Sequence, residues 1–275
     1  MSARHTTLCD KKPLSAWIQG VGLIAPGLPD WPSAMAVLNG SEPYAASPSV
    51  LPAPAILPPA ERRRASRVVK LALALGLEAA QHGQADVSTL ATVFTASGAD
   101  GHNCDALCAQ LATDDRQISP TRFHNSVHNA AAGYWGIATR AMAPCQVLCA
   151  YDASFGAGLL DAMAQVVQDQ VPVLLIAYDS EYPEPLFSKR PVPDCAGVAL
   201  LLAPQRGAHS LACLEVQPSR QSADVLSHEA LEVLRTQIPA MRSLPLLQSL
   251  ANRQSTSICL DYLAPMQLLL ELRPC

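Results

Sequence analysis

The stretch ISPTRFHNSVHNAAAGYWGIATRAMAPCQVLCAYDASFGAG, residues 118–158, decides the fold of this chain. Its pattern predicts a small-residue helix, a short connection, an apolar strand, and a sharp turn into a second helix. Enzymes often display an activated nucleophile at such a strand-to-helix turn. Here the turn holds Asp152, Ala153 and Ser154, and no cysteine. The local fold of a reactive site is therefore predicted without a thiol in it.

Composition limits the classes of function open to the chain. The 275 residues are enough for one large domain or two small ones with a sizeable core. Hydrophobic residues make up 49% and charged residues only 15%, which favours a surface covered by a partner over a merely large core. The net charge is −4, and the basic residues form a single cluster, Arg62–Arg64 with Arg67. This pattern does not indicate a nucleic-acid-binding surface. We expect that cluster to be a solvated helix face.

The sequence also suggests a compartment. No apolar run reaches membrane-spanning length, and residues 1–15 lack a signal-peptide core. We therefore expect a cytoplasmic protein without a membrane span. The nine cysteines include no C-x-x-C pair, so we interpret them as buried free thiols.

Strands alternate with helices along the chain. Strands are expected over residues 16–26, 90–96, 145–150, 171–177, 197–202 and 210–216, with more around Pro265 within 257–272. Helices are expected over 30–39, 60–81, 103–112, 125–142, 154–168 and 228–251, the last interrupted at Pro239 and Pro245. The two strands nearest residue 206 are expected to form a hairpin. Continuous apolar strands between helices predict an α/β fold with both sheet faces covered.

Six segments, in order, resemble the β-ketoacyl synthases of the thiolase-like fold. They are IQGVGLIAPG (18–27), ERRRASRVVKLALALGLEAA (61–80), VFTASGADG (93–101), the helix with Pro120, Asn129, Ala132 and Gly133, the elbow and strand up to Glu181, and PVPDCAGVALLLAP (191–204). The resemblance covers roughly residues 14–205. It implies a layered thiolase-like α/β fold, essentially the N-terminal half of a ketosynthase (1–205) with a short C-terminal extension (206–275) packed on the same domain.

Two departures from the family pattern bear on activity. When the helix after the turn, LLDAMAQVV (159–167), is aligned with the family's helix without a gap, Ala153 lies where the family has its nucleophilic cysteine. A one-residue shift of the alignment puts Ser154 there. The family's catalytic histidines lie in a second half that has no counterpart here. Alanine cannot be acylated, and a serine without a base is a poor nucleophile at neutral pH. The resemblance thus implies a cysteine-less chain length factor, of the short kind found in aryl polyene and xanthomonadin-type pigment pathways.

The same resemblance implies partners. In the family, the strand before the nucleophile pairs antiparallel with its equivalent across the dimer interface, which here involves Cys145, Val147 and Cys149, with Phe155 nearby. We expect a heterodimer, or two associated heterodimers, with a catalytic ketosynthase that receives acyl carrier protein. Residues of this chain that close the partner's acyl pocket are then Ser97, Asn103, Thr121, Arg122 and Phe123. Phe123 is either a floor that limits chain length or an ordinary core residue.

Two other functions remain open at this point. Ser154 can be the nucleophile of an acyltransferase or hydrolase, although the sequence around it is D-A-S-F-G and not G-x-S-x-G. The chain can also be a homo-oligomer that binds acyl chains or carrier protein without chemistry. Ordinary structural roles compete with each: capping for Ser154 or Asp152, and support of the elbow for Glu181.

Metal and cofactor chemistry receive little support from the sequence. His124 and His128 have i, i+4 spacing but no third ligand nearby. Tyr134 and Trp135 are expected to pack in the core. We therefore expect no metal and no cofactor.

Overall fold

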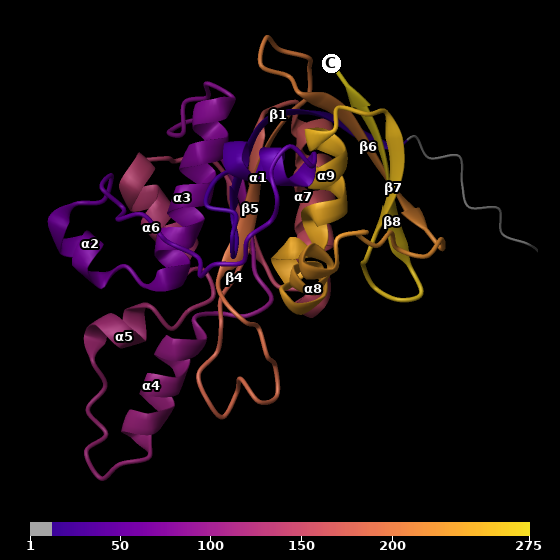
Figure 1. Cartoon of the computed structure of the whole chain (residues 1–275). Helices are drawn as coiled ribbons and strands as arrows, with labels where there is room; N and C mark the ends of the chain where they lie inside the picture. The colour runs from indigo at the N-terminus through magenta and orange to yellow at the C-terminus, as the bar shows by residue number, and fades with distance from the viewer. Residues whose placement is uncertain (1–12) are drawn as a thin grey trace, which may run out of the picture.

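Eight strands form one mixed sheet in the computed structural model of the chain, which describes residues 13–275 (Figure 1). Their order is β3-β2-β4-β5-β1-β6-β8-β7. The strands are β1 Leu14–Ile24, β2 Ala91–Thr95, β3 Cys145–Leu148, β4 Val173–Asp179, β5 Ala196–Ala203, β6 Ala212–Ser219, β7 Thr256–Leu260 and β8 Gln267–Pro274. The helices are α1 Trp31–Leu38, α2 Pro59–Arg64, α3 Arg67–His82, α4 Gly101–Leu111, α5 Pro120–His124, α6 Ala130–Thr139, α7 Ser154–Asp169, α8 Glu229–Gln237 and α9 Leu244–Ala251, with 3-10 turns η1 Tyr151–Ala153 and η2 Pro239–Ser243.

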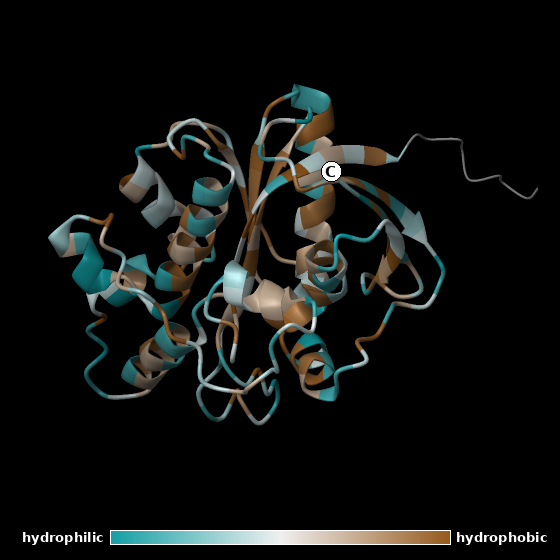
Figure 2. Ribbon diagram, turned by 45° about the horizontal axis from the view of Figure 1, so that its top comes forward, coloured by the Kyte–Doolittle hydropathy of each residue, from teal (hydrophilic) through white to brown (hydrophobic). Residues whose placement is uncertain are grey.

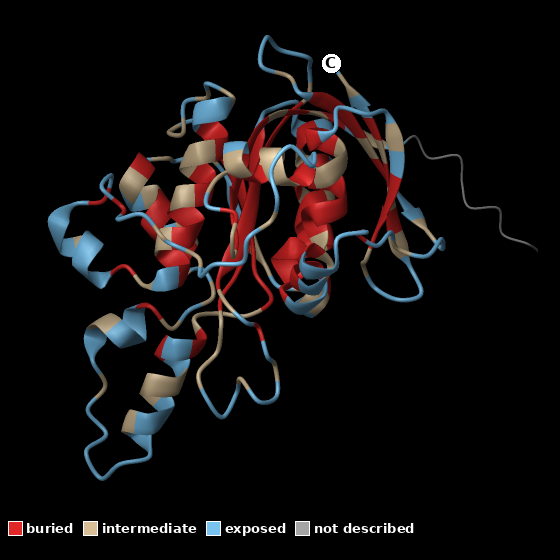
Figure 3. Cartoon of the chain, viewed as in Figure 1, coloured by how far each residue is buried: buried red, intermediate tan, exposed pale blue. Residues whose placement is uncertain are grey.

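The central strands are buried on both faces, as their continuous apolar sequences predict. Every residue of β2, β4 and β5 is buried, and the sheet is red through its centre in Figure 3. Strands β3, β2 and β4 run parallel, whereas β5 and β1 are antiparallel to their neighbours. The predicted thiolase-like layered α/β class is confirmed.

Two helix layers cover the sheet (Figures 1 and 2). Helices α3 and α6 pack on one face, and α1, α7, α8 and α9 pack on the other. Two glycines let α3 approach β1 closely: a Cβ at Gly20 would lie 2.0 Å from the Ala79 carbonyl oxygen, and one at Gly22 would lie 2.2 Å from that of Leu75. The glycines of the segment 18–27 are therefore set by helix–sheet packing.

The last 70 residues extend the same sheet. Strand β6 pairs with β1, β8 with β6, and β7 with β8, all antiparallel. Strand β1 therefore lies between β5 and β6, so the expected hairpin of 197–202 with 210–216 is wrong. The physical reason is that β1 has two open edges, and the connection after β5 crosses over it to reach the second one.

Two predicted long helices differ from the helices of the structure. The segment 60–81 divides into α2 and α3 because Ala65 is extended (ψ 118°) and buried. The side-chain amide of Asn125 donates to the Arg64 carbonyl oxygen at 3.0 Å, which satisfies the end of α2. The segment 125–142 yields only α6, preceded by the separate short helix α5. The end of α2 depends on a contact distant in sequence, whereas α6 begins five residues later and ends three residues earlier than predicted.

The signal-peptide prediction for residues 1–15 falls mostly outside the described residues. Within residues 13–275, no helix combines the length and the apolar character needed to cross a bilayer.

Candidate functional site

The turn between β3 and α7 is the position at which the sequence predicts a nucleophile. Residues Tyr151–Ala153 form a 3-10 turn that leads directly into the helix. Ala153 is only 3% exposed, and its methyl group is chemically inert. The expected capping of α7 by Ser154 or Asp152 is wrong, because the N-cap residue is Ala153 and makes no side-chain cap bond.

The hydroxyl group of Ser154 is occupied by backbone atoms. Ser154 is 2% exposed, and the Ala150 N–H donates to its Oγ at 3.0 Å. That Oγ lies 2.6 Å from the Tyr151 carbonyl oxygen and 3.1 Å from that of Ala96, and its single proton bonds one of them. No basic side chain is among these partners, so the geometry favours a structural role for Ser154.

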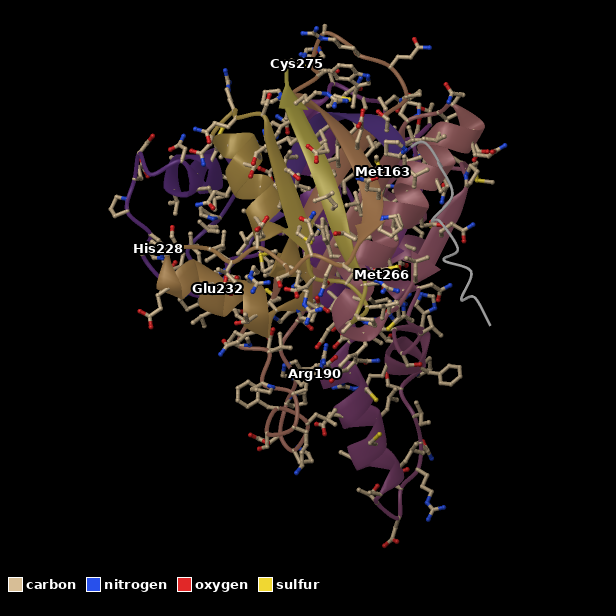
Figure 4. The ribbon with its side chains drawn as sticks, turned by 90° about the vertical axis from the view of Figure 1, so that its right-hand side faces the viewer. Met163, Arg190, His228, Glu232, Met266 and Cys275 are labelled. Carbon is tan, nitrogen blue, oxygen red and sulfur yellow. The ribbon has the colours of Figure 1, made fainter. Side chains whose placement is uncertain are left out.

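The carboxylate of Asp152 is neutralised by two arginines. Arg190 Nη2 lies 2.7 Å from Oδ1, and Arg242 Nη2 lies 3.5 Å from Oδ2. Arg190 lies where the loop after β4 meets the body of the molecule (Figure 4), and its guanidinium carbon is 3.9 Å from the centroid of the Tyr151 ring. These two ion pairs hold the carboxylate of Asp152 beside the turn, so the geometry favours a structural role for it.

A buried acid links the loop after β2 to the C-terminal segment. Asp179, at the end of β4, accepts hydrogen bonds from the Ser97 and Ala240 N–H groups, both at 2.8 Å. Burial raises the pKa of Asp179 to about 6, against the lowering effect of these hydrogen bonds. Sequence analysis missed this residue, because an aspartate that ends an apolar strand does not by itself reveal which backbone it will meet.

Strand β3 forms one edge of the sheet, as the resemblance implies. Neighbouring residues of β2 and the loop after it donate to the carbonyl oxygens of Pro144 at 3.0 Å and Leu148 at 3.4 Å. Because backbone polar groups alternate sides along a strand, Cys145, Val147 and Cys149 present theirs at the free edge. Cys145 and Cys149 are exposed and Val147 is half-buried.

An apolar helix face adjoins this region without a cover from the described residues. Helix α6 carries no charged residue, and a helix that is apolar all round is usually buried all round. Its inner face buries Tyr134 and Trp135, at 1% and 2% exposure, which confirms that they pack in the core. On its outer face Ile137 is 44% exposed, and a Cβ at Gly133 would meet no atom within 4 Å.

Helices α4 and α5 project from the body and are mostly exposed (Figures 1 and 3). Phe123 on α5 is 66% exposed, so its interpretation as an ordinary core residue is wrong. Asn103 fastens the two helices, since its side-chain amide donates to the Arg122 carbonyl oxygen at 2.8 Å. Phe155, by contrast, is 1% exposed in the core and offers no surface to a partner, contrary to expectation.

A basic hollow of about 540 Å³ lies between α3, α4 and α5. Three predicted pocket residues, Asn103, Thr121 and Arg122, line it, whereas Ser97 is not among its lining residues. Arg63, Arg64 and Arg67 join them, together with Asp100 and Glu181. The arginine cluster therefore faces a concave site rather than only solvent, which the sequence could not reveal without the break between α2 and α3.

Within residues 13–275, one group of side chains carries donor atoms close enough together to bind a metal ion, and Arg67 lies among them. Glu181, Asp194 and Cys195 bring three donor atoms within 4.8 Å of one another. The guanidinium of Arg67 lies 2.9 Å from Glu181 Oε1, 2.9 Å from Asp194 Oδ1 and 3.1 Å from Cys195 Sγ. A cation is thus already supplied by the protein. Glu181 pairs with Arg67, the first residue of α3, a helix on the opposite sheet face from α7, so its support of the elbow stays a prediction.

The histidines and cysteines differ from their predicted settings. His124 lies in α5 and His128 lies beyond its end, so the two do not share one helical face. Among the eight described cysteines, Cys195, Cys213 and Cys259 are buried, whereas the other five are exposed. The interpretation as buried thiols is wrong for those five: Cys104 and Cys108 lie on α4, Cys145 and Cys149 lie at the β3 edge, and Cys275 follows the end of β8.

The fold and the elbow together define a class: a thiolase-like α/β domain whose strand-to-helix turn at residues 151–154 contains no cysteine. The model of the family described as beta-ketoacyl synthase, N-terminal domain, matches residues 38–263. This chain belongs to that family. None of the curated proteins compared with it matches significantly.

Solved structures share the fold at low identity. A chain of the ketosynthase in complex with its chain length factor from Xenorhabdus doucetiae has 23% identity and a TM-score of 0.70, with 94% of this chain and 99% of that chain covered. The ishigamide ketosynthase/chain length factor has 15% identity and a TM-score of 0.69, with 94% of this chain and 99% of that chain covered. A chain of a type II acyl-carrier protein in complex with its ketosynthase has 12% identity and a TM-score of 0.72, with 96% of this chain and 100% of that chain covered.

Proposed function

We propose that this chain is a non-catalytic chain length factor that pairs with a catalytic β-ketoacyl synthase and shapes its acyl pocket for polyene elongation of the aryl polyene type. The observation that carries the proposal is the elbow: Ala153 has no reactive atom, and the Ser154 hydroxyl is engaged by three backbone groups. Acyl transfer needs an activated nucleophile. A chain without an activated nucleophile acts through its shape and its contacts. We also propose that the protein is cytoplasmic.

The free edge of β3 and the outer face of α6 support a partner. An exposed strand edge invites pairing with another chain, and Cys145, Val147 and Cys149 carry the backbone groups for it. On α6, Ile137 lines a hollow with Thr121 and His124 of α5, and the surface at Gly133 is open, so this helix offers a further apolar face. The matched complexes contain a ketosynthase with a chain length factor, which supports a heterodimer, or two associated heterodimers, over a homo-oligomer.

The projecting helices α4 and α5 supply the part of the chain that limits the partner's pocket. Phe123 is a large apolar side chain held outside the core of its own chain. A phenylalanine in solvent gains about 2 kcal/mol by burial, so its exposed position favours burial against another protein. We assign it as the floor of the acyl pocket, with Thr121 and Arg122 beside it on α5.

The basic hollow supports a role in receiving the acyl carrier protein. Arg63, Arg64 and Arg122 line it, and guanidinium groups favour phosphate and carboxylate groups. A carrier protein presents its acyl chain on a phosphate-bearing arm, so an anion-binding hollow beside the pocket-forming helices suits its approach. Double substitution Arg63→Ala with Arg122→Ala is expected to weaken carrier binding to the complex and leave assembly intact.

Co-expression with the ketosynthase encoded nearest to this gene tests the proposal. The two chains should co-purify as a complex, and the ketosynthase should elongate acyl chains only in its presence, as product mass analysis would report. A stable monomer that neither binds the ketosynthase nor affects its products contradicts the proposal. An acyl adduct on this chain, lost in Ser154→Ala, would instead establish the acyltransferase or hydrolase alternative.

A further inference from the structure

Tyr151 stands out as an aromatic residue that the fold holds outside its own core. It lies three residues after the end of β3, is 62% exposed, and has a backbone φ of 53°. Residues other than glycine avoid this left-handed region, so the surroundings must enforce it. The exposed ring adds nothing to the apolar core of the chain.

The neighbouring residues fix the ring in place. The Ser154 hydroxyl accepts from Ala150 N–H on one side of Tyr151 and lies 2.6 Å from the Tyr151 carbonyl oxygen on the other. The Arg190 guanidinium lies over the ring at 3.9 Å from its centroid. Asp152 binds that guanidinium and also Arg242 from η2. Backbone, serine and ion pairs therefore hold one position of the ring.

We infer that the elbow of this chain, instead of presenting a nucleophile, presents Tyr151 as the anchor that enters a pocket of the ketosynthase partner. Binding energy in protein interfaces concentrates in a few rigid aromatic and arginine residues, and preorganisation lowers the entropy lost on binding. The Tyr151–Arg190 stack has both properties, and it continues the free edge at Cys149. The inference rests on the proposed function and names the contact that drives it.

The charge around the ring indicates the chemistry of the pocket. Arg190 and Arg242 pair with Asp152, and the charge of Arg190 also lowers the pKa of the nearby buried Asp179, so two carboxylates balance the two guanidinium groups beside the ring. The partner surface that fits is an aromatic-lined or aliphatic pocket with carbonyl acceptors at its rim for the guanidinium and phenol donors. Carrier protein and a second copy of this chain are the other possible occupants, and the test separates them.

Affinity measurements on purified full-length chains with the ketosynthase test the inference. Tyr151→Ala should weaken binding by at least about 10-fold, whereas Tyr151→Phe, which keeps the ring, should stay within about 3-fold of the parent protein. Tyr151→Gly removes the ring and relieves the backbone strain, so its affinity should fall without a loss of melting temperature. Val50→Ala, at a side chain 74% exposed in another hollow, is the matched control.

The outcomes separate the two claims. If the parent protein binds the ketosynthase and Tyr151→Ala and Tyr151→Gly bind equally well, the anchor is overturned while the proposed function stands. If the parent protein does not bind the ketosynthase, both are overturned. If the variants lose self-association or carrier binding and keep ketosynthase binding, the occupant assigned here is wrong.

Discussion

Replacement of Ser154 by alanine separates a structural serine from a catalytic one. The change removes an acceptor for the Ala150 N–H and a donor to one of two carbonyls, at a residue that is 2% exposed. A buried backbone group left without its partner costs about 1–3 kcal/mol. With the loss of one net hydrogen bond of about 1 kcal/mol, we expect Ser154→Ala to destabilise the chain by roughly 2–4 kcal/mol.

Urea unfolding followed by circular dichroism measures this loss, and the transition midpoint should fall in proportion. Ser243→Ala is the matched control, because Ser243 is fully buried but makes a single bond, to the Ala240 carbonyl oxygen at 2.8 Å. Its loss should stay near 1 kcal/mol, within the range for one hydrogen bond.

A second measurement on the same variant tests the chemistry. The parent protein, incubated with an acyl thioester and the ketosynthase, should show no acyl mass on this chain. An unchanged stability of Ser154→Ala, or an acyl adduct that this variant loses, would refute the assignment of Ser154 as a structural residue.

Four further substitutions address the pocket, the buried acid and two helix faces. Phe123→Ala should leave the complex assembled and shift its products to longer chains by mass analysis; unchanged lengths from an intact complex would contradict the floor assignment. Asp179 has a folded-state pKa of about 6, above its ordinary value, so the folded state binds more protons and this carboxyl's contribution to stability falls as pH rises from about 4 to 6. The Asp179→Asn variant lacks this pH dependence. The unfolding free energy of the variant minus that of the parent protein should therefore rise by up to about 3 kcal/mol between about pH 4 and 6 and then level off. A difference that does not change with pH would contradict the raised pKa of Asp179. Gly22→Ala forces a Cβ against the Leu75 carbonyl oxygen and should prevent normal folding, whereas Gly133→Ala in open space should raise the stability of the isolated chain by up to about 1 kcal/mol and weaken the complex. Equal affinities of Gly133→Ala and the parent protein would remove α6 from the partner face.

Much of the fold could be predicted because its signals are local. The apolar run of β4 marks a doubly covered strand wherever the chain places it. The helical period around Val68, Leu71 and Leu75 predicts α3 and its end to within one residue, although the predicted start at residue 60 lies seven residues before Arg67. The lack of a cysteine in residues 150–158 is a fact of the sequence alone, and it needs no structure to exclude a thiolate in the turn.

The parts that sequence reasoning missed depend on pairs of distant residues. The end of α2 is set by Asn125, which lies 61 positions from Arg64. The place of β1 between β5 and β6 follows from two antiparallel ladders that no local pattern encodes. The basic hollow exists because the break at Ala65 turns two arginines toward α4 and α5.

The sequence by itself thus determined the types and approximate positions of most elements, the family resemblance, and the absence of a thiol at the elbow. Tertiary structure alone decided that the Ser154 hydroxyl binds backbone atoms and that Phe123 and Tyr151 lie outside the core. The physical reason is that propensity and periodicity act over a few neighbouring residues, whereas exposure and hydrogen-bond partners depend on which distant segments fold against each side chain.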